Sequence, residues 1–379
     1  MSIDDVVIIG AGAIGAAVAW RCAQRGLRTC VVDPDPTRGA WRTAAGMLAP
    51  ITELHYTETP LLRLSLDSLD RYPAFAAELE DEAGGPVGFL ACGTVLVAWD
   101  GADLAALRDQ QAFGRGLGIE ARLLSGRELR ELEPAVAAGL PGGLYAPGDH
   151  QVDPRLLHAA LVAAAERRGA RFVRAPAAVR IAGSRAVGVT LADGTELPAG
   201  HVVLAAGAWS GGVPGVPAGH AAPVRPVKGQ TLRLRLPGPP RLTRVLRGTV
   251  KGTSIYVVPR ADGQLVVGAT SEEAGFDVAP RAGAVYELLR DAQSVLPELS
   301  EAILDEVCTG LRPGSPDNAP LVGPSGVAGL LYATGHYRNG ILLAPVTADG
   351  VADLLTGKQL PGVLAAFTPD RFAVPAGAS

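Results

Sequence analysis

The spacing of hydrophobic positions at the start of the chain predicts strand, turn, helix and strand in that order. Val6 to Ile9 is apolar and β-branched, Ala13 to Arg25 repeats apolar residues at helical spacing, and Arg28 to Asp33 is extended. Gly26 ends the helix, because glycine adopts the left-handed conformation of a C-terminal cap without strain. This pattern predicts a βαβ unit.

Two later segments predict further parts of the same sheet. Asp153 and Pro154 form an N-cap followed by proline at the first helical position, and a Leu and Ala stripe continues to Arg168. Residues 173–203 predict short strands. A last strand over 329–334 leads through a glycine-bearing turn into a helix predicted over 341–356.

The remaining periodic segments predict a second sheet. Residues 231–236, 254–258 and 264–269 alternate apolar and polar positions, and a helix follows near 284–296. The sequence therefore predicts an α/β chain with a Rossmann-like nucleotide-binding domain and an interleaved, mostly antiparallel α+β substrate domain. The predicted nucleotide-binding segments are 1–85, 150–225 and 300–370, the predicted substrate-domain segments are 86–149 and 226–299, and the predicted loose tail is 371–379.

Composition excludes several classes of function. The 34 Lys+Arg residues against 38 Asp+Glu residues give a net charge of −4. No basic block is present to neutralise a phosphate backbone, so no nucleic-acid partner is expected. No apolar run reaches the length of about 18 to 20 residues that a membrane-spanning helix needs. The four cysteines lack C-x-x-C spacing, which favours free thiols in a reducing cytoplasm, and the scattered histidines predict no metal site.

The first turn carries a dinucleotide-binding motif. Gly10-Ala11-Gly12-Ala13-Ile14-Gly15 lies between the first predicted strand and helix, where backbone N–H groups and a helix N-terminus can face a pyrophosphate. Asp33 ends the second strand, where an acid suits hydrogen bonding to an adenosine ribose. The motif alone does not distinguish FAD from NAD.

Three more segments resemble the flavin-contact segments of the D-amino-acid oxidase family. They are 42–48 (RTAAGML), 202–210 (VVLAAGAWS) and 335–340 (GHYRNG), and 335–346 is most similar to the glycine oxidase branch. The resemblance implies an FAD-dependent amine oxidase. The predicted cofactor-binding residues are Gly10, Gly12, Ala13, Ile14, Gly15, Asp33, Arg42, Thr43, Ala45, Gly46, Met47, Val179, Ala206, Gly207, Trp209, His336, Tyr337, Arg338, Asn339, Gly340 and Ile341.

The segment after Gly335 has a physical reason to face a flavin. A turn followed by a helix start provides backbone donors and a positive helix end. Negative charge that develops on the N1 and C2 carbonyl side of a reduced flavin would be stabilised there. An ordinary capped helix remains the alternative reading of this segment alone.

The same resemblance implies the substrate site. Arg312 in Gly310-Leu311-Arg312-Pro313 and Tyr256 in 254–259 (SIYVVP) match the residues that bind the substrate carboxylate in this family. A guanidinium holds a carboxylate through two parallel hydrogen bonds, and a phenol donates a third. Arg338 resembles a further pocket arginine. The alternatives are a surface charge for Arg312, a core tyrosine for Tyr256 and a structural ion pair for Arg338.

Two positions depart from the glycine oxidase pattern. Ser254 and Ser271 stand where a histidine and a methionine are expected on the pocket wall, so the substrate range is open. In sarcosine oxidases, members of the same fold, a cysteine near this region attaches the flavin. Cys308 is offset from that position by about two residues, and Gly310 occupies it, so non-covalent FAD is expected.

The resemblance implies oxidative deamination of glycine by hydride transfer to flavin N5. The products would be an imine or glyoxylate, ammonium and hydrogen peroxide, with dioxygen as electron acceptor. A thiazole synthase of thiamine biosynthesis is the implied product acceptor, and relatives suggest a homotetramer. A sarcosine or other secondary-amine oxidase, a D-amino-acid dehydrogenase and a non-enzymatic dinucleotide-binding module remain alternatives.

Overall fold

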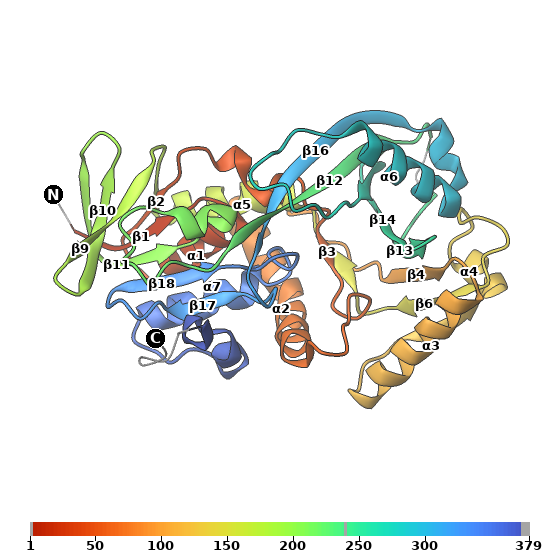
Figure 1. Cartoon of the computed structure of the whole chain (residues 1–379), viewed down its shortest axis with the longest axis horizontal. Coiled ribbons are helices and arrows are strands. Elements are labelled where there is room, and N and C mark those ends of the chain that lie inside the picture. Colours follow the sequence, from red (N-terminus) through yellow and green to blue (C-terminus); the bar gives the residue numbers. More distant parts are fainter. Residues whose placement is uncertain (1–2, 239–240, 373–379) are drawn as a thin grey trace.

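The computed structural model describes residues 3–238 and 241–372 and contains two large sheets. Figure 1 shows them side by side, with β12 and β16 as the long strands that run from one half toward the other. The first sheet has the order β17-β18-β11-β1-β2-β8, with β9 and β10 paired onto β11. Its strands are β1 (Asp4–Ile9), β2 (Thr29–Val32), β8 (Arg171–Val173), β9 (Ala177–Ala182), β10 (Arg185–Leu191), β11 (Glu196–Leu204), β17 (Leu321–Pro324) and β18 (Leu330–Thr334).

The first sheet is parallel from β18 through β8 and is buried on both faces. Val6 and Ile8 of β1 pack into the helical core, whereas Val7 and Ile9 pack into a second core with β9 and β10. Burial on both faces explains why β1 has an unbroken apolar run. The helical layer contains α1 (Ala13–Gln24), α2 (Thr59–Ala83), α5 (Pro154–Arg167) and α7 (Ala344–Leu355).

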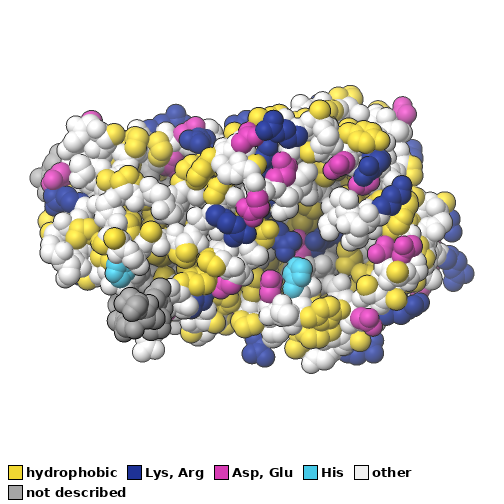
Figure 2. Space-filling view, viewed as in Figure 1, with side chains coloured by type: hydrophobic (Ala, Val, Ile, Leu, Met, Phe, Trp, Pro, Cys, Tyr) yellow, Lys and Arg dark blue, Asp and Glu magenta, His cyan; other side chains and the backbone are white. Residues whose placement is uncertain are grey.

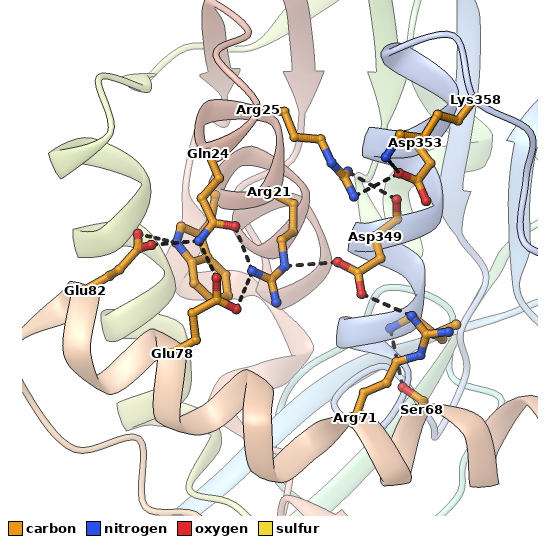
Figure 3. Close-up of polar contacts among 12 residues, drawn as sticks. Arg21, Gln24, Arg25, Ser68, Arg71, Glu78, Glu82, Asp349, Asp353 and Lys358 are labelled. Carbon is orange, nitrogen blue, oxygen red and sulfur yellow. Dashed lines mark hydrogen bonds and ion pairs between the residues drawn. The ribbon is translucent and has the colours of Figure 1, made fainter.

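An ion-pair network joins three of these helices. Arg21 of α1 pairs with Glu78 of α2 at 2.7 Å and with Asp349 of α7 at 3.0 Å. Arg71 of α2 reaches the second oxygen of Asp349 at 3.2 Å. Figure 3 shows Asp349 between the two arginines, so one carboxylate links α1 to α2.

The second sheet has the order β16-β12-β15-β14-β13-β4-β6-β5 and is antiparallel except between β13 and β4. Helix α6 packs on it, while α3 and α4 lie at its far end. Its strands are β4 (Thr94–Ala98), β5 (Arg122–Ser125), β6 (Gly142–Ala146), β12 (Arg225–Arg235), β13 (Val245–Val250), β14 (Thr253–Pro259), β15 (Gln264–Gly268) and β16 (Ile303–Gly314). The helices are α3 (Gly101–Gly116), α4 (Gly126–Leu132) and α6 (Ala282–Val295), and a short pair is formed by β3 (Met47–Leu48) and β7 (His150–Gln151).

The predicted α/β fold is confirmed, and two predicted boundaries are wrong. The segment that begins at 300 starts in the second sheet, because β16 pairs along its length with β12. The last helix begins at Ala344 instead of Ile341. Proline at position 345 has no N–H to donate to the carbonyl of Ile341, and the Tyr72 hydroxyl donates to that carbonyl at 2.7 Å.

Charged side chains of both signs are interspersed on the face of the molecule in Figure 2. Among the helices of the described residues, none is long and apolar enough to cross a membrane. Residues 373–379 of the tail that we expected to be loose lie outside the described residues. The main cavity of the described residues lies where the two sheets meet.

Candidate active site

A cavity of about 570 Å³ lies between the two sheets and is lined by residues from both. Its size is typical of small-molecule and cofactor sites. At one end it reaches the glycine-rich turn, and at the other it reaches Arg312 and Tyr256. The predicted residues on its wall are Gly10, Gly12, Ala13, Ile14, Asp33, Thr43, Ala45, Gly46, Met47, Ala206, Gly207, Trp209, Tyr256, Arg312, His336, Tyr337, Arg338, Gly340 and Ile341.

The three glycines of the first turn have different structural roles. A Cβ at Gly10 would lie 2.4 Å from the carbonyl oxygen of Ala205, and one at Gly15 would lie 1.9 Å from the carbonyl oxygen of Gly10. These two residues let the backbones pack closely. A Cβ at Gly12 would meet nothing within 4 Å and would project beside the cavity at the N-cap of α1. Gly12 thus leaves room for a bound pyrophosphate at a helix N-terminus.

Asp33 is anchored beside this turn. One carboxylate oxygen accepts the backbone N–H of Ala11 at 2.7 Å, and the other accepts that of Asp35 at 2.8 Å. Each oxygen keeps a free lone pair, and the side chain lines the cavity. The arrangement fits the two hydroxyls of an adenosine ribose.

His158 of α5 supports the turn from behind. Its Nε2 donates to the carbonyl of Ala11 at 2.7 Å, because a carbonyl can only accept. Its ring stacks on Trp41 with centroids 3.9 Å apart. Trp41 in turn lines the cavity, so this stack joins the nucleotide-binding turn to the cavity wall.

The turn after β18 carries a buried neutral histidine. Burial lowers the pKa of His336 to about 3, and its Nε2 lies 3.0 Å from the hydroxyl of Thr347. The N–H of Tyr337 donates to the carbonyl of Pro313 at 2.9 Å, which ties the turn to β16. Arg338 is exposed and contacts Nε2 of His55 at 3.2 Å.

Arg312 and Tyr256 stand over two glycines of the second sheet. Arg312 comes from β16 and Tyr256 from β14, and the strands β12 and β15 run between them. A Cβ at Gly229 would lie 2.3 Å from Nη1 of Arg312, and one at Gly268 would lie 2.3 Å from the Tyr256 hydroxyl oxygen. The absence of side chains at Gly229 and Gly268 therefore lets both polar groups lie flat over the sheet.

The electrostatics of this end favour an anion. Burial raises the pKa of Tyr256 to about 12, although the charge of Arg312 opposes the shift. The phenol therefore remains a hydrogen-bond donor at neutral pH. Among the described residues its hydroxyl has no hydrogen-bond partner, and neither Nη2 nor Nε of Arg312 has one. A carboxylate is the ligand that suits a planar cation beside a phenol.

Six predicted site residues do not line the main cavity. Gly15 packs under Gly10, and Val179 is in the core beside β10. Arg42 is exposed and pairs with Glu306 at 3.9 Å, while Asn339 faces a smaller neighbouring cavity. Ser254 and Ser271 are both exposed.

The expected placement of Ser254 and Ser271 on the pocket wall is therefore corrected. Ser254 is the second residue of β14, two positions from Tyr256 toward the β13–β14 hairpin and beyond the cavity edge. Ser271 follows Thr270 on the solvent side of the segment after β15.

Sequence reasoning missed Glu53, which lines the cavity. Its carboxylate pairs with Nη2 of Arg247 at 3.1 Å. Glu53 follows the loop residues Ile51 and Thr52, whose N–H groups donate to the buried Asp149 at 3.0 and 2.9 Å. No local pattern marks Glu53, because its position depends on partners about 100 and 200 residues away along the chain.

Asp149 makes the stability of the protein depend on pH. Burial raises the pKa of Asp149 from 3.8 to about 6, against the hydrogen bonds from Thr52 and Ile51. The folded state therefore holds this proton more tightly than the unfolded state, and the resulting stability is lost as pH rises from about 4 to about 6. About two pKa units at ~1.4 kcal/mol each correspond to about 3 kcal/mol.

We expect Asp149→Asn to remove this dependence. The difference between wild-type and variant free energies of unfolding, measured with urea, falls by about 2 kcal/mol between about pH 4 and about pH 6.5. Asp109→Asn, at an exposed position of α3, is the matched control and shows no such change. A wild-type minus Asp149→Asn difference that stays constant with pH contradicts the prediction.

Comparisons with known proteins find relatives along nearly the whole chain. The sequence pattern of the family described as DAO, FAD dependent oxidoreductase, matches residues 5–354. The chain is 36% identical over 371 residues to a glycine oxidase of Geobacillus kaustophilus, which covers 97% of each chain. The crystal structure of glycine oxidase from that organism matches with a TM-score of 0.90 at 35% identity, over 98% of this chain and 99% of that one.

A further relative is longer than this chain. The "Bifunctional protein ThiO/ThiG" of Trichormus variabilis is 36% identical over 374 residues. The match covers 97% of this chain and 55% of that protein. This chain therefore spans about half the length of the bifunctional relative.

Proposed function

Because the chain belongs to the family of FAD dependent oxidoreductases, we propose that it oxidises glycine, with dioxygen as the electron acceptor. The proposed products are glyoxylate, ammonium and hydrogen peroxide. The observation that carries the proposal is the pair Arg312 and Tyr256 at the end of a cavity whose other end is a dinucleotide-binding turn.

The residues present fit non-covalent FAD. The open space at Gly12 and the N-terminus of α1 would hold the pyrophosphate, and Asp33 would hold the ribose. Bound FAD supplies a two-electron acceptor that takes a hydride from the substrate carbon. The sulfur of Cys308 is buried near Arg155, with the Nη2 of Arg155 at 3.5 Å, and Cys308 does not line the cavity.

The chain's own residues bind and orient the substrate. Arg312 offers Nε and Nη2 to one carboxylate, and Tyr256 donates its hydroxyl to the same group. Fixing the carboxylate fixes the adjacent carbon against the cofactor, which lowers the entropic part of the barrier. The buried His336 is neutral and lies on the cavity wall, so it adds no charge there. Arg338 would add a cation at the cavity rim.

We also propose a link to thiazole formation and a homo-oligomeric state. The bifunctional relative, whose name joins ThiO to ThiG, supports a product acceptor of the thiazole synthase type. Light scattering on the purified protein measures the oligomeric state, and a monomer would remove that part of the proposal.

Turnover on a short substrate panel tests the main proposal. Oxygen uptake and peroxide formation are measured on the FAD-loaded protein with glycine, sarcosine and D-alanine. We expect glycine to drive both signals in equal amounts. Oxidation of sarcosine or D-alanine without glycine, or electron transfer to a quinone dye without oxygen uptake, contradicts the proposed activity.

A further inference from the structure

Two backbone carbonyls hold the guanidinium of Arg312 from behind. Its Nη1 donates to the carbonyl of Thr270 at 3.0 Å and to that of Lys228 at 3.4 Å. Thr270 lies just after β15, and Lys228 lies on β12. The direction of the guanidinium therefore depends on how these two segments are held together.

Glu272 holds the two segments together through its backbone. Its N–H donates to the carbonyl of Lys228, and the N–H of Lys228 donates to the carbonyl of Glu272, each at 2.9 Å. The Lys228 carbonyl that Arg312 uses is thus also an acceptor for Glu272. This isolated β-bridge continues the pairing of the sheet beyond the end of β15.

The Glu272 side chain fixes Thr270 as well. One carboxylate oxygen accepts hydrogen bonds from the Thr270 hydroxyl and from the Gln230 side-chain amide, each at 2.6 Å. The Thr270 hydroxyl oxygen in turn accepts the backbone N–H of Gln230 at 2.9 Å. These bonds leave the Thr270 residue little freedom, so its carbonyl keeps pointing at Arg312.

A buried cation completes the cluster. The side chain of Lys228 is 0% exposed, and its Nζ donates to the carbonyl of Ala279 at 2.6 Å. Glu272 lies 3.5 Å and Asp277 lies 3.9 Å from Nζ. A buried ammonium needs a nearby carboxylate, because an unpaired charge is costly to desolvate.

Charge and hydrogen bonding keep Glu272 ionised in this cluster. Burial alone would raise its pKa, but the hydrogen bonds from Thr270 and Gln230 and the charge of Lys228 hold the pKa below its usual value. The carboxylate does not line the cavity, so it contacts neither substrate nor cofactor.

We infer that Glu272, paired with Lys228, is a positioning residue that aims Arg312 at the substrate carboxylate. The inference rests on the proposed function, since it gives Arg312 its ligand. Without the Glu272 carboxylate, the Thr270 hydroxyl loses its acceptor and the Lys228 ammonium loses its nearest carboxylate. The Thr270 carbonyl is then held less firmly, and the guanidinium turns away from its binding geometry. Carboxylate binding weakens, while the nucleotide end of the cavity is unchanged.

The test compares Glu272→Gln with Glu273→Gln in the FAD-loaded protein. Glu273 is the adjacent acid, but it is exposed and pairs with Arg225 at the surface. Acetate serves as a carboxylate that cannot be oxidised, and its dissociation constant is read from the perturbation of the flavin spectrum. We expect Glu272→Gln to raise this constant and the KM for glycine by about tenfold or more, with kcat changed less. Glu273→Gln leaves both values at wild-type levels.

Two further variants keep the inference testable if Glu272→Gln does not fold. Thr270→Val removes the hydroxyl that donates a hydrogen bond to the Glu272 carboxylate and preserves the backbone. We expect its dissociation constant for acetate to lie between those of wild type and Glu272→Gln. Glu272→Asp keeps a carboxylate, so we expect it to retain part of the acetate affinity that Glu272→Gln loses. Acetate binding at the wild-type level in Glu272→Gln overturns the inference, and so does wild-type acetate binding in Thr270→Val where Glu272→Gln does not fold. If wild-type protein neither binds acetate nor oxidises glycine, the proposed function itself fails.

Discussion

Replacing Arg312 with alanine is expected to lower kcat/KM for glycine by about a hundredfold to several thousandfold. The variant loses two charge-assisted hydrogen bonds to the substrate carboxylate, together worth about 3 to 5 kcal/mol. It also removes the Arg312 hydrogen bond from the Thr270 carbonyl. KM rises because the ground state is bound through the same group, and kcat falls because the reacting carbon is no longer fixed.

Steady-state kinetics with oxygen uptake check this prediction. Arg312→Lys keeps the charge but not the planar pair of donors, and we expect it to recover only part of the activity. Arg225→Ala, on the neighbouring strand and paired with Glu273 at the surface, is the control and keeps wild-type kinetics. Unchanged kinetics in Arg312→Ala would show that Arg312 does not bind the substrate carboxylate.

Gly12→Asp is expected to weaken FAD binding strongly and leave the fold intact. The backbone at Gly12 has φ −71° and ψ −175°, which any residue adopts, and its Cβ would meet no protein atom within 4 Å. Gly12 is the N-cap of α1 without a side-chain cap, so aspartate there suits the helix. The carboxylate, however, occupies the space for the pyrophosphate and repels it. Like charges in contact cost several kcal/mol, so the FAD dissociation constant rises by about a hundredfold or more.

Fluorescence titration of the apoprotein with FAD measures the affinity, and thermal unfolding measures the fold. Gly12→Ala should lose less affinity, since it adds bulk without charge. Gly10→Ala is the contrasting variant, because Gly10 has φ +109° and its Cβ would lie 2.4 Å from the carbonyl oxygen of Ala205. We expect that variant to lower the unfolding temperature. Tight FAD binding by Gly12→Asp would show that the pyrophosphate lies elsewhere.

Local sequence patterns predicted the parts of the fold that local forces determine. The helix from Ala13 and the helix capped by Asp153 were predicted to begin where they do, since glycine, proline and N-cap residues act within one turn. Asp153 accepts the N–H groups of Arg155 and Leu156, as its position implied. The membership of β16 in the second sheet was missed, because it depends on pairing with β12, about 80 residues earlier.

In the candidate site too, local sequence predicted some features, and others depend on residues far apart along the chain. The glycine-rich turn and Asp33 share one local unit, so their proximity follows from the βαβ pattern. Arg312 and Tyr256 were proposed from resemblance, and the structure places both on the cavity wall, where their roles stay predictions.

Gly229 and Gly268 were missed as a pair, although glycine inside a strand signals a close approach. Glu272 and Lys228 carry no local signal, since their partnership exists only across strands.

The visible spectrum of the FAD-loaded protein without oxygen, recorded before and after excess glycine, measures whether glycine reduces the bound flavin. We expect the flavin absorption bands to bleach with glycine and to return when air is admitted. Flavin bands that are present and stay unchanged in excess glycine would contradict it.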